Sequence, residues 1–258
     1  MRVFVFLLII TSASSAQAQI KDLAKTSNRC IKQSRQHLVN DELNKAIAIA
    51  NKGLELSIVE HSFDFNLLIG LAQLQLGDYD KALSHLHTAR ELETHGSSMN
   101  KIELYWAIGN CYIDQNDPAS TVKYYKEILT LDPDHEEAKV NIGKYLVDSG
   151  RTTEGLSYLD PLINAGTKYE SMARLSRAYA YLQLVRYEEA ESDLFICEVL
   201  EPKNPYVHMG LVSYYYLTKN NVMLCEAVAK AKSLDHSLYE YHSDLQELNE
   251  IQKKFCSK

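Results

Sequence analysis

The chain repeats itself about every 34 residues, and this period limits its fold more than any other feature. Equivalent residues, mostly small or apolar, recur at steps of 36, 39, 34, 35 and 34 along the series Ala46, Ala82, Thr121, Gly155, Ala190 and Leu224. A second series follows the same period through Gly70, Gly109, Gly143, Ala178 and Val212. Periods of this length are typical of stacked supersecondary units. The sequence therefore predicts an array of similar units.

Each repeat has the pattern of two amphipathic helices joined by a tight turn. In residues 63–92, apolar side chains recur at helical spacing on both sides of Gly77 and Asp78. Glycine accepts the left-handed conformation that ends a helix, and aspartate caps the helix that follows. Asp117 and Pro118 serve the same purpose in the next repeat, because proline is tolerated in the first turn of a helix. These features predict an all-α fold.

Two segments carry a family resemblance. Residues 68–83, which include Gly-Asp-Tyr-Asp-Lys-Ala-Leu, and residues 129–134, Leu-Thr-Leu-Asp-Pro-Asp, resemble the tetratricopeptide repeat. The resemblance implies a right-handed α-solenoid of about six helix pairs with a C-terminal capping helix at 237–256. It places residues 19–258 in one domain, with units at 27–60, 63–96, 102–135, 136–169, 171–204 and 205–238. The alternative is an irregular helical bundle, which would not require a shared period.

The fourth repeat departs from the pattern at two positions. Gly155 stands where alanine is expected, and glycine costs roughly 1 kcal/mol in a helix interior. Pro161 falls inside the expected second helix, where it removes a hydrogen bond and clashes with the preceding turn. We therefore expect a weakened helix with a kink in this repeat.

The first 18 residues have the features of a signal peptide. Arg2 precedes an apolar run of eight residues at 3–10, and a small-x-small pattern ends at Ala18. We therefore predict cleavage between Ala18 and Gln19. The apolar run is less than half of the ~20 residues that a membrane span needs. No second long apolar stretch follows, so the mature chain is expected to be exported and to have no stable membrane span.

The resemblance also implies where a partner would bind. In such a solenoid the first helices line the concave side, and repeat positions 2, 5, 9, 12 and 13 look into the groove. The groove predicted in this way is mostly apolar and aromatic, which favours a protein or peptide segment as its ligand. Its predicted lining is Leu67, Leu71, Trp106, Asn110, Val140, Asn141, Lys144, Leu175, Tyr179, Tyr206, Met209 and Tyr216. The alternative is that close packing of neighbouring first helices buries these side chains as core.

Signs of catalysis, metals and nucleic acids are missing from the sequence. The formal charge is −7, whereas nucleic-acid binding needs basic side chains that neutralise phosphates. His85 and His87 are two residues apart, so on a helix they point to different sides and cannot share a metal. No catalytic motif or phosphate-binding glycine loop is present. We expect no enzyme activity, no metal and no cofactor.

The five cysteines are too sparse for a disulfide framework. Cys225 begins the last second helix and Cys256 ends the capping helix. These helices should run antiparallel, which would bring the two cysteines together. An oxidising compartment could then join them, and the alternative is a pair of free thiols.

Taken together, these observations favour an exported, non-enzymatic scaffold or adaptor that binds a protein or peptide in its concave groove. The bacterial periplasm or secretion is the expected location, with a role in envelope, secretion or pilus assembly by analogy with the family. A second hypothesis is a small-ligand or carbohydrate-binding protein, or an enzyme, that uses the groove. A third is a structural subunit that associates with itself through the same surface.

Overall fold

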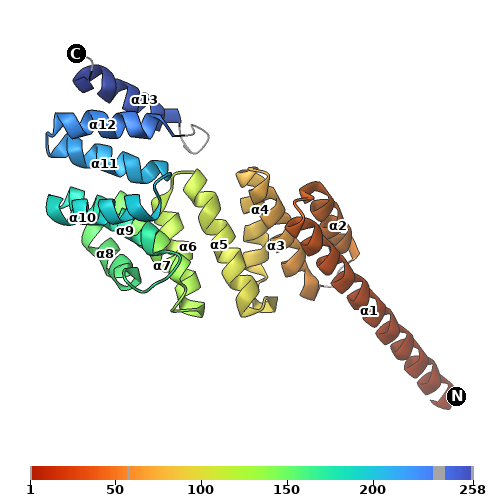
Figure 1. Cartoon of the computed structure of the whole chain (residues 1–258). Helices are drawn as coiled ribbons and strands as arrows, with labels where there is room; N and C mark the ends of the chain where they lie inside the picture. The colour runs from red at the N-terminus through yellow and green to blue at the C-terminus, as the bar shows by residue number, and fades with distance from the viewer. Residues whose placement is uncertain (1, 57–58, 235–241, 257–258) are drawn as a thin grey trace. The chain divides into compact units, whose positions relative to one another are not determined.

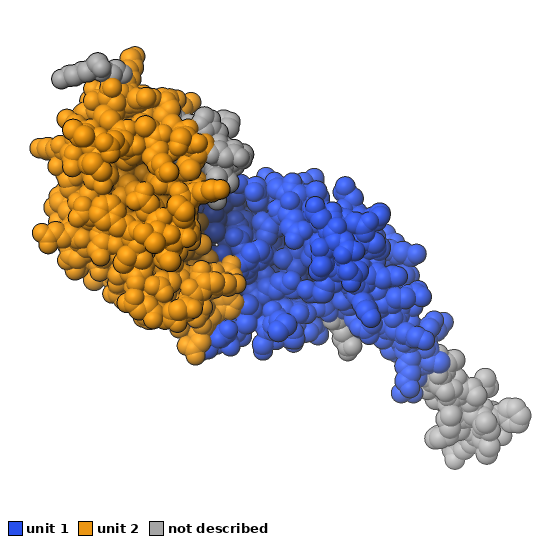
Figure 2. All heavy atoms as spheres, viewed as in Figure 1, with its two compact units in different colours: residues 1–133 blue, residues 134–258 orange. Residues whose placement is uncertain are grey.

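The computed structural model describes residues 2–56, 59–234 and 242–256. Every regular element in these ranges is helical (Figure 1), which confirms the predicted all-α class. The chain divides into two compact units, unit 1 over Met1–Pro133 and unit 2 over Asp134–Lys258 (Figure 2). The division falls close to the predicted boundary between the third and fourth repeats. Each unit is described by itself.

Unit 1 contains three helix pairs. Its elements are α1 (Arg2–Val39), α2 (Leu43–Leu56), α3 (Val59–Gln75), α4 (Tyr79–Glu91), the short 3-10 helix η1 (Glu93–His95), α5 (Ser98–Asp114) and α6 (Pro118–Leu131). The two helices of each pair pack together, and α3 also packs against the first helices of both neighbouring pairs. The predicted signal segment is part of α1, and its removal stays a prediction.

Unit 2 contains three further pairs and the C-terminal helices. Its elements are α7 (Glu136–Asp148), α8 (Thr152–Leu159), the 3-10 helix η2 (Asp160–Leu162), α9 (Glu170–Gln183), α10 (Tyr187–Leu200), α11 (Pro205–Leu217), α12 (Asn221–Lys232), α13 (His242–Ile251) and the π-helix η4 (Gln252–Cys256). The pairs pack as in unit 1, and α9 contacts both α7 and α11. The predicted capping helix at 237–256 is present from residue 242 onward, and residues 237–241 lie outside the described ranges.

The turns inside the pairs use the predicted residues. Gly77 has φ +75°, in the left-handed region that glycine accepts without strain. The carboxylate of Asp78 then accepts a hydrogen bond from the backbone N–H of Lys81 at the start of α4. Asp117 accepts one from the N–H of Ser120, and Pro118 occupies the first turn of α6. The helix boundaries thus follow from local side-chain chemistry.

In the fourth repeat the second helix is interrupted near Pro161, where a kink was predicted. Gly155, in contrast, has a role in packing. α8 ends at Leu159, and Pro161 lies in the 3-10 helix that follows, because proline cannot continue the α-helical hydrogen bonds. A Cβ atom at Gly155 would lie 2.8 Å from the carbonyl oxygen of Gly143 on α7. The glycine therefore permits a close approach of α7 and α8.

α3 is the most enclosed helix of unit 1. Helices α1, α2, α4 and α5 all pack on it. Five of its large side chains expose at most 1% of their surface: Phe63, Phe65, Leu67, Leu68 and Ile69. Full burial of each such side chain stabilises the fold by about 1.5–3 kcal/mol. The core of unit 1 is centred on this helix, so most of its apolar surface is not available to a partner.

Among the described residues, no helix is both long and apolar enough to cross a membrane.

Candidate protein-binding surface

Four of the predicted groove residues belong to the core instead. Leu67 and Val140 are fully buried, and Leu71 and Met209 expose 5% and 9% of their surface. Leu67, Val140 and Met209 all occupy position 5 of their repeats. Neighbouring first helices pack closely enough to cover these three side chains, as the alternative interpretation of the apolar stripe expects. The prediction of a groove lining is therefore wrong for these four residues.

The first helices of unit 1 present polar groups rather than the apolar groove predicted. The guanidinium of Arg35 on α1 donates two hydrogen bonds of 3.0 Å to the carboxylate of Glu103 on α5. Asn100 donates a 2.7 Å hydrogen bond to Asp64 on α3. Burial raises the pKa of Asp64, while His61 and the bond from Asn100 oppose this effect. These side chains already pair with one another, which leaves little apolar area here.

Trp106 and Asn110 on α5 are the predicted residues of unit 1 that remain partly exposed. The side-chain amide of Asn110 donates a 2.8 Å hydrogen bond to the backbone carbonyl of Trp106. The two residues therefore lie one turn apart on the same side of α5. Trp106 is the one large aromatic side chain among the predicted residues of unit 1.

In unit 2, Asn141 and Lys144 on α7 are partly exposed and contact their own helix. Asn141 donates a 2.9 Å hydrogen bond to the carbonyl of Glu137. The ammonium of Lys144 lies 4.6 Å from the ring centroid of Tyr145. This is a cation–π contact at a partly exposed site, worth about 0.5–1 kcal/mol. Neither residue has an arrangement specific for a ligand.

Leu175 and Tyr179 on α9 and Tyr206 on α11 form a half-buried row on adjacent first helices. Leu175 and Tyr179 each pack against a core cluster of unit 2 and keep part of their surface exposed. The hydroxyl of Tyr179 donates a 3.3 Å hydrogen bond to the backbone carbonyl of Tyr206. This bond joins the fifth and sixth repeats. The row offers apolar area and polar tips, a combination that protein interfaces favour.

Tyr216 lies at the edge of a cavity that we call the C-terminal hollow. The hollow has a volume of about 410 Å³ and lies between α11 and the C-terminal helices. Its lining is Val212, Ser213, Tyr216 and Leu217 of α11, Glu247, Glu250 and Ile251 of α13, and Lys254 and Phe255 of η4. The rings of Tyr216 and Phe255 meet edge to face, with centroids 5.6 Å apart.

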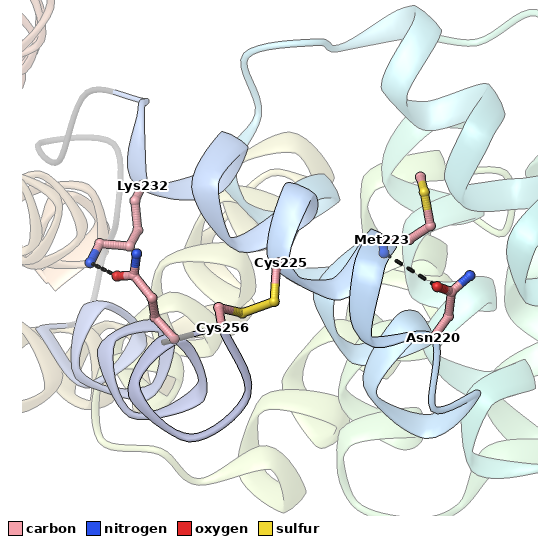
Figure 3. Close-up of a disulfide and its surroundings, with 6 residues drawn as sticks. Asn220, Met223, Cys225, Lys232 and Cys256 are labelled. Atoms are coloured by element: carbon pink, nitrogen blue, oxygen red, sulfur yellow. Dashed lines mark hydrogen bonds between the residues drawn. A yellow bond between two sulfur atoms is a disulfide. The ribbon is translucent and has the colours of Figure 1, made fainter. Parts of the chain in front are cut away.

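The wall formed by α13 and η4 is fastened to α12. Cys225 and Cys256 form a disulfide with a Cα–Cα distance of 5.5 Å (Figure 3). Lys232, also on α12, donates hydrogen bonds of 2.6 Å to the side-chain oxygens of Asn249 and Gln252. Leu248 is fully buried in the core cluster of α11 and α12. Covalent, polar and apolar contacts therefore fix this wall of the hollow.

Most of the hollow was not predicted from the sequence, because the C-terminal helix was expected only as a cap. Glu247 and Glu250 of this helix both border the hollow. A signal was available: positions 9, 12 and 13 of the sixth repeat are Ser213, Tyr216 and Leu217, so any helix packed on α11 would border them.

A buried ionic cluster in unit 2 was also missed. Asp193 on α10 accepts hydrogen bonds from Arg174 at 3.0 Å and from Arg177 at 2.7 and 3.0 Å. Arg174 also bonds to Glu170, and Arg177 to Asp160. Arg177 occupies repeat position 7, which normally packs between helices, so its charge was visible in the sequence. The cluster is internally paired and serves to hold α9 against α10.

The described part of the chain contains no group of three His, Cys, Asp or Glu side chains arranged to hold a metal ion. The accessible features are instead half-buried aromatic side chains on first helices and the C-terminal hollow. This combination defines a helix-pair repeat protein whose first helices are partly exposed in unit 2.

Comparisons with known proteins identify the repeat. Residues 102–135 and 140–195 match models of the tetratricopeptide repeat. These two segments are therefore similar to the tetratricopeptide repeat, in agreement with the resemblance seen in the sequence. A search of curated proteins found no significant relative.

Solved structures agree on the fold. A tetratricopeptide repeat protein from Parabacteroides merdae has a TM-score of 0.71 and 17% identity, over 89% of this chain and 86% of the other. PilW, a type IV pilus biogenesis factor, has a TM-score of 0.60 and 18% identity, over 74% and 84%. YrrB, described as having an unusual peptide-binding site, has a TM-score of 0.57 and 19% identity, over 69% and 88%. At these identities the likeness concerns the fold alone.

Proposed function

We propose that this protein is an exported, non-enzymatic scaffold that binds a protein or peptide segment on the first helices of unit 2. The observation that carries the proposal is the row of Leu175, Tyr179 and Tyr206, which stays partly exposed on two adjacent helices. Aromatic side chains that combine an apolar body with a polar tip contribute much of the binding energy at protein interfaces. The C-terminal hollow provides a further recess on α11.

The fold supports this class of function. Tetratricopeptide arrays generally act as protein-interaction modules. Two of the similar structures are a pilus biogenesis factor and a protein with a peptide-binding site. By analogy, we place this chain in the assembly of envelope, secretion or pilus components. Export rests on the signal-peptide pattern that ends at Ala18.

Site-specific photo-crosslinking tests the binding surface. A photoreactive amino acid is placed at Tyr179 or Tyr206 on the first helices, and at the exposed positions Glu188 or Ser192 of α10 as matched controls. We expect the first-helix positions to capture one and the same partner in the native host, and the α10 positions to capture none. Equal capture from both surfaces would contradict the proposal.

Export has its own test. The intact mass of protein recovered from the expressing cells is compared with the mass expected for a chain that begins at Gln19. We expect the mature mass in the exported fraction. Retention of the full-length mass in every fraction would contradict export and leave the binding proposal standing.

An apolar row on α10 favours self-association as a second candidate function. Phe195, Ile196, Val199 and Leu200 expose between 37% and 82% of their surface. Exposed apolar residues grouped in this way often mark an interface. Light scattering at several protein concentrations measures this directly. A constant monomer mass would reject self-association.

A further inference from the structure

We infer that the C-terminal hollow recognises a peptide segment in which an apolar side chain is flanked by cationic ones. This inference rests on the proposed function and names the partner chemistry that one part of the surface selects. It assigns a binding role to α13 and η4, whose sequence indicates only a cap.

The floor of the hollow suits one large apolar side chain. Tyr216 and Leu217 expose 45% and 42% of their surface there. Phe255 meets Tyr216 edge to face and packs partly against the core. A volume of about 410 Å³ lies near the lower end of known ligand pockets, about 300–1,000 Å³. It therefore fits a single anchoring residue with its neighbours better than an extended cofactor.

The rim carries two acidic side chains from α13. Glu247 and Glu250 are three residues apart on α13, so they lie on one face of the helix. Both are exposed, and neither forms an ion pair with another described residue. Like charges placed this close together favour a cation between them.

The basic side chain at the hollow does not cancel this charge. The ammonium of Lys254 lies 5.1 Å from the ring centroid of Phe255, where the face of the aromatic ring attracts it. Two carboxylates thus face one ammonium at the hollow, and the whole chain has a net charge of −7. Both the local and the overall charge attract a cationic partner and repel an acidic one.

The hollow is also held in shape before a ligand arrives. The disulfide (Figure 3) and the two hydrogen bonds from Lys232 fix α13 and η4 on α12. A wall that is already ordered does not lose further conformational freedom on binding, which improves affinity.

The experiment uses three capped synthetic peptides as probes. Their central residues are Lys-Phe-Lys, Glu-Phe-Glu or Lys-Ala-Lys, in an identical Gly-Ser context. We expect the full-length mature protein to bind the Lys-Phe-Lys probe at least tenfold more tightly than either other probe. Tenfold corresponds to about 1.4 kcal/mol, and the loss of an aromatic anchor at the centre of an interface commonly exceeds this. Binding should weaken as the salt concentration rises.

Matched variants locate the binding. Exchange of Glu247→Gln together with Glu250→Gln should weaken Lys-Phe-Lys binding about fivefold, because two exposed ion pairs are lost. The control exchanges Glu188→Gln and Glu226→Gln, which change the net charge equally at exposed positions outside the hollow, and should have no effect. All four changes are on the surface, and circular dichroism checks that the variants remain folded.

Several outcomes would overturn the inference. One is equal binding of all three probes, and another is equal weakening by the control pair. A third is a dimer that dissociates in Tyr216→Ala, because a second copy would then occupy the hollow. If the Lys-Phe-Lys probe does not bind but a photoreactive residue at position 179 still captures a partner, only this assignment is rejected. Failure of both experiments would reject the proposed function as well.

Discussion

Arg174 of α9 and Asp193 of α10 form an ion pair inside unit 2. The guanidinium Nη1 lies 3.0 Å from Oδ1 of the carboxylate, and the two side chains expose only 7% and 3% of their surface. Charges removed from water in this way are stable only when every hydrogen bond is satisfied. Here Arg177, Glu170 and Asn164 complete the cluster.

The first prediction concerns this pair. Asp193→Ala should lower the free energy of unfolding by about 3 kcal/mol, because it leaves buried guanidinium groups without their main partner. Asp160→Ala is the control. Its carboxylate is about half exposed and bonds to Arg177 alone, so we expect a loss below about 1 kcal/mol. Urea denaturation followed by circular dichroism measures both, and equal losses would refute a dominant role for Asp193.

The second prediction concerns the turn between α9 and α10. Val185 has φ +60°, a left-handed conformation in which a β-branched residue is strained, and it exposes 67% of its surface. Val185→Gly should raise the stability by about 1 kcal/mol, since glycine adopts this conformation without strain. Val222→Gly, on the exposed side of α12, should instead lower it by a few tenths of a kcal/mol, because glycine is a poorer helix former than valine. Thermal unfolding of the wild type and the two variants measures these changes in stability. A change of the same sign in both variants would contradict the prediction.

The third prediction concerns the disulfide. Thiol alkylation in denaturant should modify three cysteines without reductant, Cys30, Cys111 and Cys197, and five with it. Denaturant is needed because burial raises the pKa of Cys111 and of Cys197 to about 12, so their thiols are unreactive in the folded protein. Five modified thiols in unreduced protein from the native host would disprove the bond.

Loss of the disulfide should loosen the C-terminal helices. The bond closes a loop with a sequence separation of 31, for which chain entropy gives about 3–4 kcal/mol. In Cys225→Ser with Cys256→Ser, hydrogen exchange of residues 246–256 should accelerate. Reductant should accelerate it in the wild type and leave the double variant unchanged. No difference between oxidised and reduced wild type would show that packing alone holds these helices.

The fourth prediction is a dependence of stability on pH. Burial lowers the pKa of His85 and of His87 below the ordinary value of 6.5, and nearby Arg90 adds to the effect at His87. The unfolded chain therefore binds protons below pH 6.5 that the folded chain does not. The free energy of unfolding is therefore unaffected by protonation of these two histidines above pH 6.5. It decreases as the pH falls from 6.5 toward their lower pKa values in the folded state.

A double variant isolates this contribution. In His85→Gln with His87→Gln, the fall in urea midpoint between pH 7.5 and pH 5.5 should be smaller than in the wild type. His95→Gln, at an exposed position of η1, should keep the wild-type fall. The same fall in all three proteins would assign the pH dependence to other groups.

The sequence by itself determined the repeat, its helix pairs and most of their boundaries. These features depend on interactions between residues a few positions apart, such as the cap that Asp78 forms on Lys81 and the stop at Pro161. The left-handed turn at Gly77 and the apolar side of each second helix have the same local origin. Periodicity reports such interactions directly, and the all-α array followed from it.

Only the tertiary structure decided which side chains remain accessible. Leu67 and Leu175 occupy the same repeat position, yet the first is fully buried under its neighbours and the second is partly exposed. The role of Gly155 was visible only when the backbone of Gly143 was placed against it. The C-terminal hollow joins Tyr216 to Glu250 across helices that a repeat pattern does not relate. Burial and cavities depend on packing between segments that are far apart in the sequence. The spacing of residues along one chain does not give the distances between its helices.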